Sequence, residues 1–88
     1  MQREFLPEAA LDLKEIKGDS PEASARVSKI IRERIYQLKN FPKMGPVVRG
    51  SKTRRRLIIP RLPYFAVYRI EESSIKILRV YHMKRNWS

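Results

Sequence analysis

The chain has 88 residues, which is enough for one domain (residues 1–88) and not for two. It contains no cysteine, which excludes disulfides, zinc–thiolate sites and a cysteine nucleophile, and makes a reducing cytoplasm the expected location. No apolar run approaches the roughly 20 residues that a membrane span needs, and the first residues have no signal-peptide character, so no membrane partner is expected.

Charge is distributed unevenly along the sequence. Twenty Lys and Arg residues against nine Asp and Glu residues give a formal net charge of +11. Residues 1–33 are nearly neutral, whereas residues 34–88 hold fourteen bases and two acids, which leaves +12. No acid lies between Arg34 and Arg69. Such a field attracts phosphate backbones or an acidic protein, although a basic, solvated surface without a partner is the plain alternative.

The first half of the chain carries helical patterns. Residues 2–6 can form a short strand, and Pro7 suits the first turn of a helix because its missing N–H costs nothing there. Apolar residues then recur at helical spacing up to Gly18, which can end this first helix. The pattern therefore predicts a short strand followed by a first amphipathic helix.

A second helix start follows almost at once. Ser20 is a suitable N-cap and Pro21 a suitable first residue. An apolar stripe from Val27 to Leu38 predicts a helix that runs to about Asn40, beyond which Pro42 forbids continuation. The two helices are expected to form a hairpin with a very short turn.

The second half carries strand patterns. Residues 43–52 are expected to form a loop, and three strands follow at 54–59, 64–70 and 75–82, with a polar turn at 71–74. Turns this short favour an antiparallel meander. The order β-α-α-β-β-β predicts an α+β fold, with a helical hairpin on one face of a small, mostly antiparallel sheet and the other face partly open.

Four segments in this order resemble the RelE/ParE superfamily of toxins from bacterial type II toxin–antitoxin systems. Residues 35–45 resemble the Leu…Pro…Gly junction after the long helix of that family, residues 56–70 its central hairpin, and residues 77–87 its last strand and C-terminal tail. Residues 5–16 fit more weakly. The resemblance covers nearly the whole chain and implies a RelE/ParE-like fold.

The resemblance also implies a function and partners. Members of this superfamily are toxins of plasmid-stabilisation (addiction) modules, and a cognate acidic antitoxin neutralises them. RelE-type members are ribosome-dependent mRNA endoribonucleases, whereas ParE-type members inhibit DNA gyrase without a nuclease centre. The stretches 59–64 and 79–82 resemble ParE more closely. We therefore expect a gyrase inhibitor that is not an enzyme and needs no cofactor; an endoribonuclease that acts on ribosome-bound mRNA is the alternative.

Cleavage of RNA through the 2′-hydroxyl would need a base, an acid and a cation. The residues that could take such roles are Arg56, Arg79, His82 and Arg85. His82 is the only histidine and shares strand parity with Leu78 and Val80, so packing at the edge of the core is its alternative role. The acids fall in the first third of the chain or in the turn at 71–72, so no compact acid–base pair is evident, and no metal site is expected.

The strand arginines point to a binding surface. Arg54 and Arg56 share one face of their strand, and Arg55 points to the other, where its head group is expected to reach solvent. Arg69 and Arg79 lie inside apolar strands, so they either reach solvent at a sheet edge or form an open basic face for phosphates or antitoxin carboxylates. The residues expected to bind a partner or nucleic acid are Arg54, Arg55, Arg56, Arg61, Tyr64, Arg69, Arg79, Arg85 and Trp87.

Overall fold

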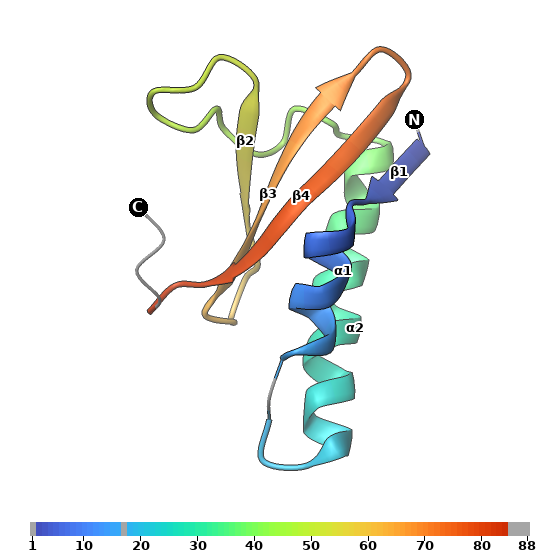
Figure 1. The fold of residues 1–88 in the computed structure, drawn as a ribbon, viewed down its shortest axis with the longest axis vertical. Helices are drawn as coiled ribbons and strands as arrows, with labels where there is room; N and C mark the ends of the chain where they lie inside the picture. Colours follow the sequence, from blue (N-terminus) through green and yellow to red (C-terminus); the bar gives the residue numbers. More distant parts are fainter. Residues whose placement is uncertain (1, 17, 85–88) are drawn as a thin grey trace.

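The computed structural model describes residues 2–16 and 18–84. The elements in chain order are β1 (Gln2–Phe5), α1 (Pro7–Lys14), α2 (Pro21–Tyr36), a 3-10 helix η1 (Gln37–Lys39), β2 (Arg54–Ile58), β3 (Tyr64–Glu71) and β4 (Ser74–His82). The predicted α+β order is confirmed, and Figure 1 shows α1 and α2 on the same side of the sheet. Within the described ranges, no helix is long and apolar enough to cross a membrane.

Both helices begin where the sequence predicts, but α1 ends early. The Ser20 hydroxyl accepts a hydrogen bond from the amide of Ala23 at 3.1 Å, as an N-cap does. α1 ends at Lys14, four residues before Gly18, so the prediction that Gly18 ends this helix is wrong. Gly18 lies instead against the start of α2, where an added Cβ would come within 2.9 Å of the Ala23 Cβ. Close approach of the segment between the helices to the first turn of α2, rather than helix termination, favours a glycine here.

The sheet has the strand order β1-β4-β3-β2. β2, β3 and β4 form the predicted antiparallel meander, whereas β1 runs parallel to β4, with Gln2 opposite Ser74. Glu71 and Ser74 pair as strand residues, so the turn between β3 and β4 is tighter than the predicted four-residue turn. The sheet therefore joins the first and last described strands of the chain.

The core lies between the helices and one face of the sheet. Ile31, Ile35 and Leu38 are fully buried, and they pack in one cluster with Tyr68 and Ile77. The Tyr68 hydroxyl donates a hydrogen bond to the Pro42 carbonyl at 2.8 Å and accepts one from the Gly45 amide at 3.0 Å. Tyr68 therefore ties the loop before β2 to the core.

A β-bulge interrupts the alternation of β4. Val67 lies opposite Arg79 and Tyr68 opposite Ile77, so Leu78 is the extra residue. Ile77 faces the core before the bulge and Val80 faces it afterwards, while Leu78 and Arg79 both line a hollow on the other face. The predicted parity of His82 with Leu78 is therefore wrong, because the extra residue shifts the pattern by one.

Candidate functional site on the open face of the sheet

The face of the sheet turned away from the helices carries four of the arginines that the sequence singles out. We call it the open face, and Figure 1 shows that neither helix covers it. The alternation of β2 and β3, and the bulge in β4, place the following side chains on it: Arg54, Arg56, Phe65, Val67, Arg69, Leu78, Arg79 and Tyr81. Arg54, Arg56, Arg69 and Arg79 are thus brought onto one surface from three strands.

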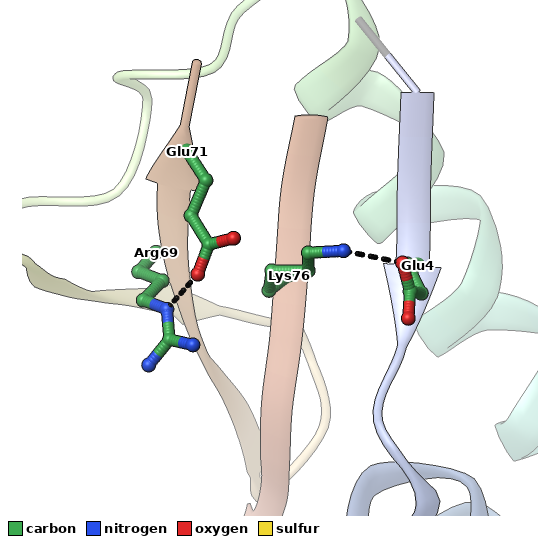
Figure 2. A network of polar contacts seen from close by, with 4 residues as sticks. All are labelled: Glu4, Arg69, Glu71 and Lys76. Atoms are coloured by element: carbon green, nitrogen blue, oxygen red, sulfur yellow. Dashed lines mark hydrogen bonds and ion pairs between the residues drawn. The ribbon is translucent and has the colours of Figure 1, made fainter. Parts of the chain in front are cut away.

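At one end of the open face the charges are neutralised within the chain. Figure 2 shows Arg69 paired with Glu71 on β3, and Lys76 of β4 paired with Glu4 of β1. These side chains are partly exposed, so the pairs contribute little to stability. They do cancel charge locally, and Arg69 is therefore compensated by its own strand.

Beyond this end, two adjacent aromatic rings lie between two arginines, and the four residues come from three strands. The Arg56 guanidinium lies 5.4 Å from the centroid of the Phe65 ring, and Phe65 and Tyr81 are 5.5 Å apart at an interplanar angle of 35°. The Arg79 guanidinium lies 5.0 Å from the Tyr81 centroid. We call these four residues the arginine–aromatic row. Cation–π contacts of this kind hold both arginine head groups close to the aromatic rings.

Asp12 of α1 fixes the end of this row. Its carboxylate accepts hydrogen bonds from Arg79 Nε at 2.7 Å and Nη2 at 3.0 Å, and from the Val80 amide at 2.8 Å. The hydrogen bonding that Arg79 donates to the Asp12 carboxylate raises the pKa of Arg79 above its ordinary value. β1 stops pairing at Phe5, so Asp12 satisfies an amide of β4 beyond the reach of that strand. The Asp12 carboxylate therefore has two roles: it accepts the backbone amide that a neighbouring strand would otherwise bind, and it orients Arg79.

A hollow of about 450 Å³ opens between this face and the start of α1. Arg54, Arg69 and Arg79 contribute three cationic groups to it against the one carboxylate of Glu8, while Val67 and Leu78 contribute apolar surface. The combination suits a ligand that presents carboxylates or phosphates beside apolar groups.

The sequence profile of the ParE toxin of type II toxin–antitoxin systems (parDE) matches residues 3–87. The chain belongs to the ParE toxin family. A candidate toxin, Y4kP of Sinorhizobium fredii, is 35% identical over 72 residues, which span 82% of this chain and 73% of that protein. The predicted membership of the RelE/ParE superfamily, closer to its ParE branch, is thereby confirmed.

Solved structures share the fold of this ParE-family toxin. A chain of the chromosomal ParDE system of P. aeruginosa superposes with a TM-score of 0.83 at 24% identity, covering 96% of this chain and 97% of that one. The isolated E. coli RelE toxin superposes with a TM-score of 0.74 at 13% identity, covering 98% of this chain and 87% of that one. At these identities the likeness establishes the fold, which both branches of the superfamily share.

Other predicted residues of the ParE-family toxin lie away from the open face. Arg55 is half-buried, and its Nη1 donates hydrogen bonds to the carbonyls of Gly45 at 2.8 Å and Lys43 at 3.4 Å. Arg61 is exposed in the β2–β3 turn with a φ of 68°. The predictions for Arg85 and Trp87 fall outside the described residues.

His82 is separated from the arginine–aromatic row of this ParE-family toxin. His82 alternates with Tyr81, so it points to the other face of β4. There its ring and that of Tyr64 form a T-shaped pair, with ring centroids 5.0 Å apart. Its Nδ1 accepts the Lys84 amide at 3.0 Å, so a neutral ring carries its proton on Nε2. The structure therefore brings together Arg56 and Arg79 but not His82.

Sequence reasoning missed Asp12 and Phe65. Asp12 borders the buried stripe of α1, three residues after Ala9 and four before Ile16, and that spacing was an available signal for an acid facing the sheet. Phe65 alternates with Val67 and Arg69, which places it on the open face, yet it is only 2% exposed because side chains cover it there.

Proposed function

We propose that this toxin inhibits DNA gyrase by binding it, and that a cognate acidic antitoxin neutralises the toxin by covering the open face. The observation that carries the proposal is the separation of His82 from Arg56 and Arg79. Cleavage of RNA needs a proton donor and acceptor beside the stabilising cation. Here the two arginines are held by aromatic rings and by Asp12, while the histidine lies on the opposite side of β4. This arrangement favours a toxin that works by binding, as the resemblance to ParE-type toxins implies.

The first test measures gyrase supercoiling and cleaved DNA with purified toxin, beside mRNA cleavage on purified ribosomes. We expect gyrase to be inhibited and mRNA to stay intact. H82Q removes the imidazole and should change inhibition little, whereas R79A removes a directional cation and should weaken inhibition more. If His82 were a general acid or base, H82Q would cost about 10²–10⁴-fold in rate. Codon-phased mRNA cleavage that is lost in folded H82Q would refute the proposal and favour an endoribonuclease.

The chemistry of the open face supports an antitoxin that binds there. One of the solved relatives is a RelBE toxin–antitoxin complex of E. coli, with a TM-score of 0.74 to this chain. The hollow offers Arg54 and Arg79 beside Leu78 and Val67, and Ile58 on the same face is 44% exposed. An antitoxin segment that alternates acidic and apolar side chains would place its acids beside the arginines and bury the apolar side chains.

A second prediction concerns the rate of antitoxin binding. The charge of +12 over residues 34–88 attracts an acidic chain at long range. Salt screens this attraction, because the Debye length is about 10 Å at 0.1 M ionic strength. The association rate constant should therefore fall as salt is added, while the dissociation rate constant changes less. Stopped-flow mixing at low and high salt measures both constants. An association rate that does not respond to salt would contradict electrostatic steering.

A further inference from the structure

The loop that leads into β2 carries a second charged surface, which shares Arg54 with the open face. We propose that residues 48–54, which we call the basic loop, bind the phosphate backbone of double-stranded DNA. The inference rests on the proposed function, because a gyrase inhibitor meets its target while that enzyme holds DNA. It adds a second contact, with the nucleic acid itself, to the contact with the protein.

The charges of the basic loop are not compensated within the described part of the chain. Arg49, Lys52 and Arg54 are exposed, and none of them forms an ion pair there. Arg69 and Arg79, by contrast, each pair with a carboxylate of this chain. The charge of the basic loop is therefore available to an external anion, whereas much of the charge on the neighbouring strands is already used.

The basic loop is closed by its own hydrogen bonds. The Val48 amide donates to the Arg54 carbonyl at 2.7 Å, and the Ser51 amide donates to the Val48 carbonyl at 3.0 Å. The Ser51 hydroxyl accepts from the amides of Thr53 at 3.2 Å and Arg54 at 3.0 Å. Gly50 takes a φ of +85°, which suits glycine. A loop fixed in this way presents its three cations with little ordering cost on binding.

The position of the basic loop makes it accessible. In Figure 1 the yellow-green loop before β2 extends beside that strand, on the side of the sheet remote from β1 and away from the helices. Its base is anchored, because the Arg56 amide donates to the Pro46 carbonyl at 2.9 Å and Arg55 binds the Gly45 carbonyl. A rigid base and an exposed tip favour contact with a large, extended partner.

The side chains of the basic loop suit duplex DNA better than a protein or a single strand. Ser51 and Thr53 are small and polar, and Arg and Lys donors with such neighbours are typical of phosphate contacts. Residues 48–54 include no aromatic residue, whereas proteins that bind single strands stack bases on aromatic rings. Tyr81, a partly exposed aromatic residue of the kind that suits a protein interface, lies on the open face instead.

Fluorescence anisotropy with a labelled duplex DNA of mixed sequence tests the inference without gyrase. The full chain is titrated at several salt concentrations, beside the triple variant R49Q/K52Q/R54Q. A matched control, K14Q/R26Q/K29Q, removes the same charge from exposed positions on the helices. We expect the loop variant to bind about tenfold more weakly or worse, and its salt slope to fall by about one for each cation removed, about three in all. The control should bind nearly as the parent chain does.

Three results would overturn the inference. The first is an equal loss of DNA affinity in the loop variant and the control, which would reflect net charge alone. The second is unchanged DNA binding in the loop variant. The third is loss of antitoxin binding without loss of DNA binding, which would assign the loop to an acidic protein. Tighter binding to single-stranded RNA than to duplex DNA would also refute it. Circular dichroism checks folding, and the exposed single replacements R49Q and K52Q serve if the triple variant does not fold.

The gyrase assay separates the two proposals. A chain that inhibits gyrase equally well with and without the loop cations, and that does not bind DNA, contradicts the inference and leaves the proposed function intact. A chain that binds DNA through the loop but does not inhibit gyrase contradicts the proposed function and leaves the loop assignment intact.

Discussion

Replacing Tyr68 with phenylalanine is expected to lower the free energy of unfolding by about 1–3 kcal/mol, the cost of leaving buried polar groups without partners. The hydroxyl of Tyr68 accepts from the Gly45 amide and donates to the Pro42 carbonyl, and the residue is fully buried. Phenylalanine keeps the ring but removes both bonds. Urea denaturation followed by circular dichroism measures the change. Y36F is the matched control, because Tyr36 is 50% exposed and the same deletion should be nearly neutral there.

The pH dependence gives Y68F a second readout. Burial raises the pKa of Tyr68 above its ordinary value of 10.0, and the Gly45 amide and the charge of Arg55 offset this only in part. The unfolded chain therefore loses this proton first as pH rises. The stability from Tyr68 is fully present below pH 10.0 and is lost as pH rises through the higher pKa of the folded state. The difference in unfolding free energy between the parent chain and Y68F should therefore shrink as the pH rises above 10.0. A difference that stays constant across this range would contradict this account.

Replacing Asp12 with alanine is expected to destabilise the fold and to weaken the toxin. The substitution removes the acceptor of three hydrogen bonds, from two nitrogens of Arg79 and from the Val80 amide. The Asp12 side chain is 15% exposed but that of Arg79 is 42% exposed, so solvent screening limits the loss to about 2 kcal/mol. The measurements are urea denaturation and the toxin concentration that half-inhibits gyrase.

Two variants make the result for Asp12 interpretable. D12N keeps an oxygen that can accept the Val80 amide but loses the charge that holds Arg79, so its stability should lie between those of the parent and D12A. D19A removes an exposed aspartate near the start of α2 and serves as the control. If D12A is as stable as D19A and inhibits gyrase as the parent does, Asp12 does not position Arg79.

The sequence predicts features that depend on neighbouring residues and misses those that depend on distant ones. The start of α2 is predictable because Ser20 and Pro21 act on the next turn of backbone. The end of α1 is not, because Gly18 lies beyond that helix and serves a close contact with Ala23 in the first turn of α2. The same holds for Arg55, whose side of β2 follows from alternation but whose carbonyl partners come from a loop that folds over it.

The candidate site is predictable only in part, for the same reason. Arginines inside apolar strands mark Arg69 and Arg79 as unusual from the sequence. Their partners are less accessible to sequence reasoning, since Asp12 and Arg79 are 67 positions apart and meet only because α1 borders β4. The bulge at Leu78 is equally hidden, because residues 75–82 read as an ordinary strand.

The parallel pairing of β1 with β4 means that the sheet can be completed only after the last described strand has been synthesised. Arg3 pairs with Ile75, so the first strand waits for 72 further residues before its partner exists. Such distant contacts must also overcome the entropy of closing a long loop of chain. Tyr81 and Arg79, half of the arginine–aromatic row, arrive with that same last strand. A nascent chain therefore cannot complete the open face before β4 has been synthesised and paired, so an antitoxin that covers this face, as we propose, finds its whole binding surface only after that step.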